Sequence, residues 1–410
     1  MPKRWLALLA ALMLLPGLTL AEGGALMVST RWEADAAVLQ TLLVRLEMDE
    51  ESACQLSEIG AELMQRLTTH ILWQSNGAQA TIRLRDREIV SGSFVCEDGG
   101  VYLRCSVIPG IALFVPDVNM NPLGLTGEEL EQLGLDILTG ATDAAKAWLD
   151  GFKQRQVSPI VGDAYGEAAN AYACSADAEQ IAGLLSSLWQ AYVSALPSEL
   201  RESMTEPPQI AIPESMRATI TVARREDMEP VGFDVTISMD QQQVFTCSMS
   251  LKDMRLVIGA LLDNGFCYAD VAVSESAAAG GQEGPRCDIA LYDGRGVSYA
   301  EAKLDPERRL MDIRCSSHWD DDPDGICTEE TLILLPGTEQ AAIRCTTDIK
   351  RSKAISAYEA GDTVIRVSEG GAIAEEDMQR MDEALSKGRS TLMTRLLMNL
   401  PPKVVKLLSE

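Results

Sequence analysis

The sequence is poor in histidine, in aromatic residues and in positive charge. Its 410 residues include two His and only 5% aromatic side chains, and 35 Lys plus Arg face 61 Asp plus Glu, for a formal net charge of −26. Binding to duplex nucleic acid requires a basic surface for the phosphates, so the charge balance argues against that function. Two histidines supply few ligands for a Cys/His metal site. The low aromatic content also argues against a carbohydrate-binding cleft, which aromatic side chains usually line.

Common catalytic motifs are missing as well. The sequence has no G-x-S-x-G turn to present a nucleophilic serine, no G-x-x-x-x-G-K-[ST] phosphate loop and no H-E-x-x-H zinc helix. We therefore predict a protein that is not an enzyme. Because 46% of the residues are hydrophobic, a disordered chain is not expected. No long apolar run follows the first one, so we do not expect an integral membrane protein.

The N-terminal segment has the pattern of a secretory signal peptide. Lys3 and Arg4 precede a continuous apolar run over residues 5–15, and small residues precede Glu22. A membrane anchor is the alternative, but Pro16 interrupts the run before it reaches the roughly 20 residues needed to cross a bilayer. We therefore predict a signal peptide over residues 1–21 and a secreted, extracytoplasmic protein.

The predicted secretion bears on how the ten cysteines are interpreted. An even number in an oxidising compartment permits five disulfides, although small buried thiols are the alternative interpretation. Several cysteines are in phase with apolar positions of strand-like runs, as in Phe245, Cys247 and Met249. Cys315 and Cys327 bracket a short acidic loop and are the first pair to test. The other disulfide candidates are Cys96, Cys105, Cys247, Cys267, Cys287 and Cys345.

Hydrophobic periodicity predicts helices followed by strands, and then the same order again. Helical spacing covers residues 32–47 and 56–67, whereas strand-like runs cover 78–85, 89–96, 101–108 and 111–115. Helical spacing returns at residues 127–138, 142–152 and 176–196, with Ser175 as the expected start of the last helix. Further strand-like runs cover residues 231–239, 243–251, 265–274, 286–292, 297–304, 309–315, 330–335 and 340–347.

This order predicts an α+β fold with a large, curved antiparallel sheet, a half-barrel-like meander packed with helices from the N-terminal and central segments. Residues 22–371 are expected to form this region, either as one unit or as two closely packed helix-then-meander halves that divide near residues 117–160. Residues 372–410 are expected to form an amphipathic helical tail.

The arrangement weakly resembles the half-barrel of bacterial lipoprotein-localisation carriers. The resemblance lies in the order of elements over residues 32–347, and in runs such as 89–96 followed by 101–115. It includes no diagnostic motif and transfers no functional residue. It implies a curved sheet around helices with an apolar cavity for acyl chains.

Two local patterns suggest binding sites. Asp320, Asp322 and Asp324 alternate before Gly325, which is the spacing of a calcium loop, but Thr331 occupies the position of the closing glutamate. The choice is between a calcium site and a solvated turn, and no other cofactor is predicted.

The second pattern is the C-terminal tail. Residues 387–409 contain five basic side chains and no acidic one, interleaved with Leu, Val and Met. Such a helix suits an anionic membrane surface or an acidic protein partner, or else it packs on the protein's own core. We predict a binding protein for an apolar or lipid-like ligand held between sheet and helices. The alternative is an interaction module that acts through its surface and this basic helix.

Overall fold

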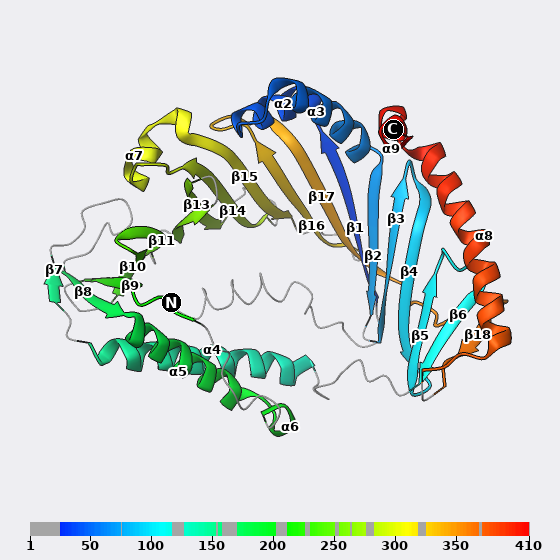
Figure 1. Ribbon diagram of the computed structural model, residues 1–410, viewed down its shortest axis with the longest axis horizontal. Helices are drawn as coiled ribbons and strands as arrows, with labels where there is room; N and C mark the ends of the chain where they lie inside the picture. Colours follow the sequence, from blue (N-terminus) through cyan, green and yellow to red (C-terminus); the bar gives the residue numbers. More distant parts are fainter. Residues whose placement is uncertain are drawn as a thin grey trace. The chain divides into compact units, whose positions relative to one another are not determined.

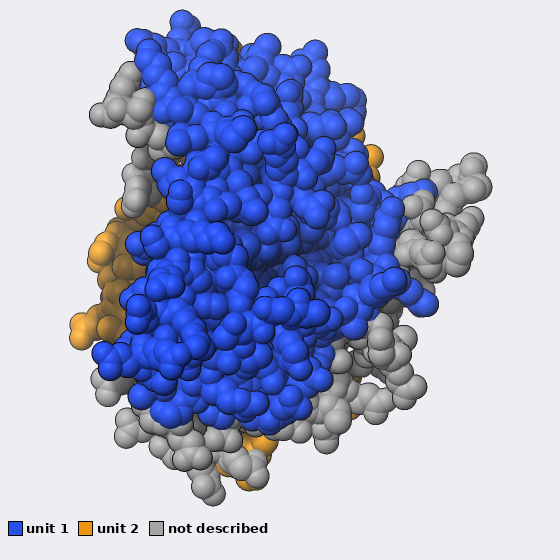
Figure 2. Space-filling model, turned by 90° about the vertical axis from the view of Figure 1, so that its right-hand side faces the viewer, with its two compact units in different colours: residues 1–122, 277–284, 315–410 blue, residues 123–276, 285–314 orange. Residues whose placement is uncertain are grey.

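The computed structural model, drawn as a ribbon in Figure 1, divides into two compact units, which Figure 2 shows in different colours. Unit 1 comprises residues 1–122, 277–284 and 315–410, and unit 2 comprises residues 123–276 and 285–314. The structure describes residues 25–74, 76–116, 127–152, 155–157, 170–201, 211–225, 230–250, 254–262, 265–275, 283–318, 325–368 and 371–409.

Unit 1 contains an antiparallel sheet in which β2 to β6 pair successively as hairpins. β1 lies between β2 and β17, β17 also pairs with β16, and β18 joins β6 in parallel. Its strands are β1 (Ala25–Ala34), β2 (Leu67–Gln74), β3 (Gly77–Leu84), β4 (Arg87–Glu97), β5 (Gly100–Cys105), β6 (Ile111–Pro116), β16 (Gly325–Leu334), β17 (Ala341–Ser352) and β18 (Thr363–Arg366). Asp98 and Gly99 both have positive φ, as a tight two-residue hairpin turn between β4 and β5 requires.

In the described part of unit 1, the helices beside this sheet are α2 (Ala36–Arg45), α3 (Glu50–Met64), α8 (Glu375–Asn399) and α9 (Pro402–Ser409). Asp35 and Asp49 accept hydrogen bonds from the first turns of α2 and α3, so each helix begins at an acidic cap. α2 contacts β17, α3 contacts β1 and α8 contacts β4. Figure 1 shows these helices along the same side of the unit 1 sheet.

Unit 2 is built in the same way. β8 leads through α5 to β9, which pairs antiparallel with β8, and β9 to β14 continue as a meander. Its strands are β7 (Arg155–Val157), β8 (Asn170–Asp177), β9 (Arg217–Arg224), β10 (Pro230–Met239), β11 (Gln242–Ser250), β12 (Arg255–Leu262), β13 (Gly265–Glu275) and β14 (Glu283–Asp293). β15 (Arg309–His318) passes from unit 2 into unit 1, and the helices are α4 (Gly127–Asp150), α5 (Ala178–Ala195), α6 (Ser198–Arg201), α7 (Tyr299–Leu304) and the 3-10 turn η1 (Pro306–Arg308).

The predicted α+β class with a large antiparallel meander is confirmed. Three local predictions are wrong. Residues 32–34 end β1 and are not helical, residues 299–304 form α7 and not a strand, and Asp177, not Ser175, caps α5. At α7, Ser298 and Glu301 form a capping box, and this local hydrogen bonding outweighs the strand-like pattern.

Candidate functional site

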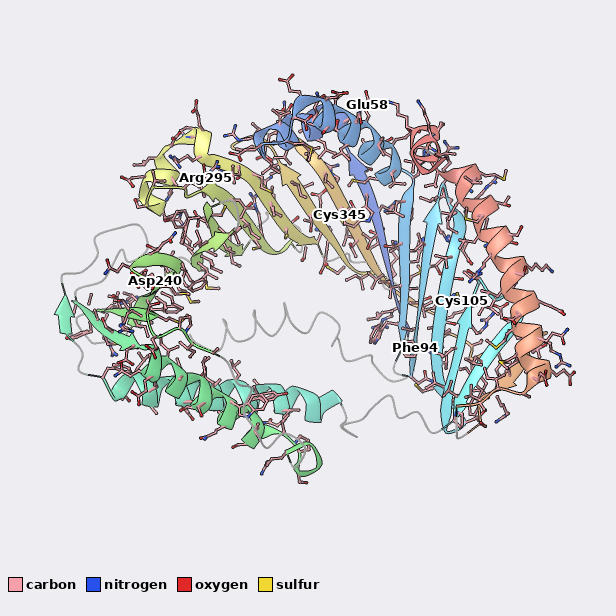
Figure 3. All side chains as sticks on the ribbon, viewed as in Figure 1. Glu58, Phe94, Cys105, Asp240, Arg295 and Cys345 are labelled. Carbon is pink, nitrogen blue, oxygen red and sulfur yellow. The ribbon has the colours of Figure 1, made fainter. Side chains whose placement is uncertain are left out.

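The unit 1 sheet has one face that is almost entirely apolar, which we call the open face. Residues directly opposite each other in an antiparallel pair project to the same side, so the register assigns every strand residue to one of two faces. The open face includes Leu26, Val28, Thr30 and Trp32 of β1, Thr69, Ile71 and Trp73 of β2, Ala78, Ala80 and Ile82 of β3, Val90 and Phe94 of β4, Leu103 and Cys105 of β5, and Cys345, Thr347 and Ile349 of β17. Phe94, Cys105 and Cys345 are labelled in Figure 3.

Several large side chains on the two faces differ in burial, although Ile349 on the open face is itself only 7% exposed. On the opposite face, Val95, Tyr102 and Phe114 are 2–4% exposed and form a cluster with Ala357. On the open face, by contrast, four large apolar side chains keep 41–44% of their surface accessible: Ile71, Trp73, Ile82 and Leu103. Contiguous exposed apolar surface of this kind is typical of a binding site, because a folded monomer gains stability by covering it.

One polar row crosses the open face. Glu329 of β16 is opposite Thr347 of β17, which is opposite Thr30 of β1, which is opposite Thr69 of β2. The hydroxyls of Thr30 and Thr347 are 3.2 Å apart and form a hydrogen bond. Burial among apolar neighbours raises the pKa of the Glu329 carboxyl above its usual range. We call these four residues the polar row.

A cavity of about 940 Å³ lies at the end of β1 beside the start of α2, and residues from both faces of the sheet line it. Trp32 and Leu67, which are two residues along their strands from Thr30 and Thr69, contribute to its lining. Charged side chains complete the lining, among them Asp35 at the start of α2. Arg31, Glu33 and Arg344 of this lining belong to the opposite face, so the cavity lies at the end of the sheet and is not part of the open face alone.

Unit 2 has an equivalent face. Register places Phe233 and Val235 of β10, Cys247 and Met249 of β11, and Ile258 of β12 on one side of its sheet, all with intermediate exposure. The opposite side is the buried one, with Val257, Tyr268 and Tyr292 only 5–6% exposed. In both units, then, the apolar side of the sheet is the less buried side.

A hydrogen-bonded ion pair anchors α7 to the buried side of the unit 2 sheet. Arg255 donates to both carboxylate oxygens of Asp270, at 2.7 and 2.5 Å, and also to the hydroxyl of Tyr299 at 2.8 Å. Tyr299 donates to Asp270 at 2.6 Å. Burial alone would raise the pKa of Asp270, but the bonds from Arg255 and Tyr299 outweigh it and lower that pKa below its usual range. Both carboxylate oxygens of Asp270 and the hydroxyl of Tyr299 have partners within the cluster, as in a structural network.

The predicted disulfides are not seen, because none of the ten cysteines is joined to another by a disulfide bond in the structure. Cys345 is opposite Thr331, whose hydroxyl contacts the sulfur of Cys315 at 3.7 Å, whereas Cys327 lies four residues further along β16. That offset is about 13 Å, well beyond the roughly 7 Å limit for bridged Cα atoms. The other candidates are also not directly opposite one another: Cys96, Cys105, Cys247, Cys267 and Cys287.

Two further predictions fall outside the described residues: the signal peptide over 1–21 and the calcium loop with Asp320, Asp322 and Asp324. Within the described ranges, no group of three or more His, Cys, Asp or Glu side chains is arranged to hold a metal ion. No helix in that part of the chain is both long and apolar enough to cross a membrane.

His70 forms a hydrogen bond with Ser29, with 2.8 Å between Nδ1 and Oγ. Burial and the nearby cations Arg83 and Arg31 lower the pKa of His70, so the ring is neutral near pH 7. Asp348, opposite Ser29 in the register, is instead paired with Arg31 at 2.7 Å. Asp348 therefore does not act as the carboxylate that would orient His70 in a catalytic triad.

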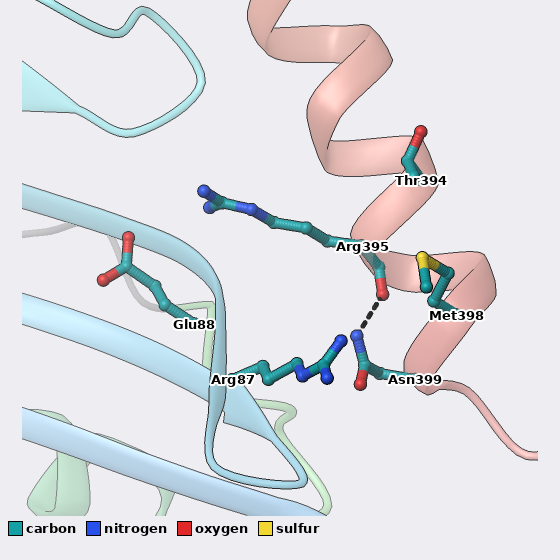
Figure 4. A pocket seen from close by; sticks show the side chains of 6 residues that line it. All are labelled: Arg87, Glu88, Thr394, Arg395, Met398 and Asn399. Atoms are coloured by element: carbon teal, nitrogen blue, oxygen red, sulfur yellow. Dashed lines mark hydrogen bonds between the residues drawn. The ribbon is translucent and has the colours of Figure 1, made fainter.

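The basic tail packs on unit 1. Lys403 of α9 pairs with Glu58 of α3, and Arg66 donates to the carbonyl of Asn399 at 3.3 Å. A pocket of about 430 Å³ lies between the end of α8 and the start of β4. Its lining includes Arg87, Glu88 and Arg395 (Figure 4). Met393, Leu397 and Met398 remain 50–64% exposed on α8.

Sequence reasoning missed the polar row. Residues 340–347 show the strand alternation, but β1 and β2 were expected as helix or left unassigned, so Thr30 and Thr69 could not be brought beside Thr347. No protein-family model matches the chain, and no match was found among the curated proteins or the solved structures.

Proposed function

We propose that unit 1 is a binding module for an amphipathic, lipid-like small molecule, whose apolar part lies on the open face. The observation that carries this proposal is the inverted burial of the sheet: Ile71 and Trp73 are 42% and 44% exposed, while Val95 on the other face is 2% exposed. Covering such side chains contributes about 25 cal/mol for each Å² removed from water. An alkyl chain fits the open face, because this face carries almost no charge.

The first test is direct. Native mass spectrometry of protein purified from its host, followed by solvent extraction, is expected to recover a bound amphiphile. The second test adds dodecanol to the purified full-length protein and follows binding by calorimetry. Ile71→Asp places a charge in the middle of the open face and is expected to abolish binding. Leu304→Asp is the matched control, because Leu304 is 83% exposed on α7 of unit 2. Equal binding by both variants would place the ligand elsewhere.

A second candidate is an interaction module that acts through α8. Met393 and Leu397 are one helical turn apart and are 55% and 50% exposed, with Arg389 one turn earlier. This stripe suits an acidic protein partner or a membrane surface. Met393→Asp should then remove partner or vesicle binding and leave dodecanol binding unchanged. If Met393→Asp still binds both the partner and the vesicles, this candidate is eliminated.

A further inference from the structure

Glu329 is a half-buried carboxyl group on the largely apolar open face. It has no hydrogen bond or ion pair with any residue in the described part of the chain, whereas its neighbour Glu330 projects to the opposite face and pairs with Arg344 at 3.2 Å. Removing a carboxylate from water without a partner costs free energy. A ligand group that pairs with the Glu329 carboxylate would offset this cost and so stabilise the complex.

The surroundings of Glu329 determine which group fits. Its cross-strand neighbour is the hydroxyl of Thr347, followed by those of Thr30 and Thr69, all of which offer acceptor lone pairs. Arg351 shares the open face but lies four residues along β17 from Thr347, or about 13 Å away. Arg31 and Arg344 belong to the other face and already have acidic partners.

An anionic head group is disfavoured here. A fatty-acid carboxylate beside Glu329 would place two like charges together, and the chain as a whole already carries a net charge of −26. A neutral alcohol could bond to the threonines but would leave the carboxylate without a counter-charge. A primary ammonium group supplies three donors and the missing positive charge, and bonds between charged groups are the strong ones.

We propose that the polar row is a head-group subsite that selects a long-chain primary amine, with its ammonium group between Glu329 and Thr347. This inference rests on the proposed function, because the alkyl chain must lie on the open face. From the polar row, the chain would run over the rows of Val28 and Ile71 and then of Leu26 and Trp73. Those rows extend about 13 Å beyond Thr30, at 3.3 Å for each residue.

The experiment compares three probes that share one chain: dodecylamine, dodecanol and dodecanoate. Each is titrated below its micelle concentration into the full-length protein near pH 7, by calorimetry. We expect dodecylamine to bind about tenfold more tightly than dodecanol, because a hydrogen bond to a charged group contributes more than a neutral one. Dodecanoate should bind more weakly than either.

Two isosteric variants of adjacent residues separate selectivity from general charge. Glu329→Gln keeps the shape but removes the charge on the open face, so the preference for the amine should disappear while dodecanol still binds. Glu330→Gln removes one charge from the opposite face and should retain the preference.

The outcomes are distinct. Equal affinities for amine and alcohol in the unchanged protein, or a preference that survives Glu329→Gln, would overturn the head-group assignment and leave the apolar site intact. Absence of binding by all three probes would overturn the proposed function, and this inference with it.

Discussion

Two isoleucines on opposite faces of the unit 1 sheet test whether the open face is free in the folded protein. Ile89 of β4 is 4% exposed and Ile71 of β2 is 42% exposed. Truncation of a buried isoleucine to alanine costs about 2–5 kcal/mol, because the lost transfer energy is increased by the cavity left behind. At Ile71 much of the side chain is already in water and no closed cavity forms, so we expect Ile71→Ala to cost about 1 kcal/mol or less.

The assay is equilibrium unfolding in urea, followed by far-UV circular dichroism, with both variants beside the unchanged protein. Ile89→Ala should lower the unfolding midpoint clearly, while Ile71→Ala should shift it little and should weaken dodecanol binding. A loss of stability for Ile71→Ala as large as that for Ile89→Ala would refute the reasoning. It would mean that the open face is packed in solution and unavailable to a ligand.

Three other expectations concern the rest of the molecule. Asp270→Asn should lower the free energy of unfolding by about 3 kcal/mol at pH 7, because it leaves Arg255 without its charge partner. Folding lowers the pKa of Asp270, so the difference between the variant and the unchanged protein should shrink as the pH falls below about 4. Urea unfolding at several pH values would show this. Gly388→Ala should destabilise the packing of α8, measured as faster proteolysis of the tail, because the added Cβ would overlap the carbonyl oxygen of Val107; unchanged proteolysis would contradict that contact. Alkylation of the unfolded protein without reductant should modify all ten cysteines, and any shortfall detected by mass spectrometry would indicate a disulfide.

Sequence periodicity predicted the hairpins well where polar and apolar residues alternate. Residues 231–239 are the clearest case, and they form β10. It failed at β1 and β2 for a physical reason. Both strands are central in unit 1, yet each adjoins a helix in sequence, and the apolar residues of 32–47 and 56–67 fit a helical period across the boundary. Pairing with β17, more than 300 residues away, settles the conformation of β1, and no local pattern can show that.

The candidate site could not be predicted from the sequence, because it too depends on long-range strand pairing. The cysteines were correctly placed in phase with apolar strand positions, but phase alone does not give the distance between two sulfur atoms. Likewise, Glu329 is notable only because register puts it beside Thr347 and Thr30. Which side of a sheet the helices cover is a tertiary property, so the exposure of Ile71 and Trp73 could not be predicted from their apolar character.

The pairing of β1 with β17 also affects how the chain folds. The hydrogen-bonded hydroxyls of Thr30 and Thr347 are 317 residues apart in sequence, and all of unit 2 is synthesised between them. β1 to β6 therefore leave the ribosome early, with the β1 edge unpaired until β17 follows. Such a long loop closure slows folding and leaves a sheet edge open to aggregation. We expect this protein to depend on a holding chaperone during synthesis more strongly than its size alone would require.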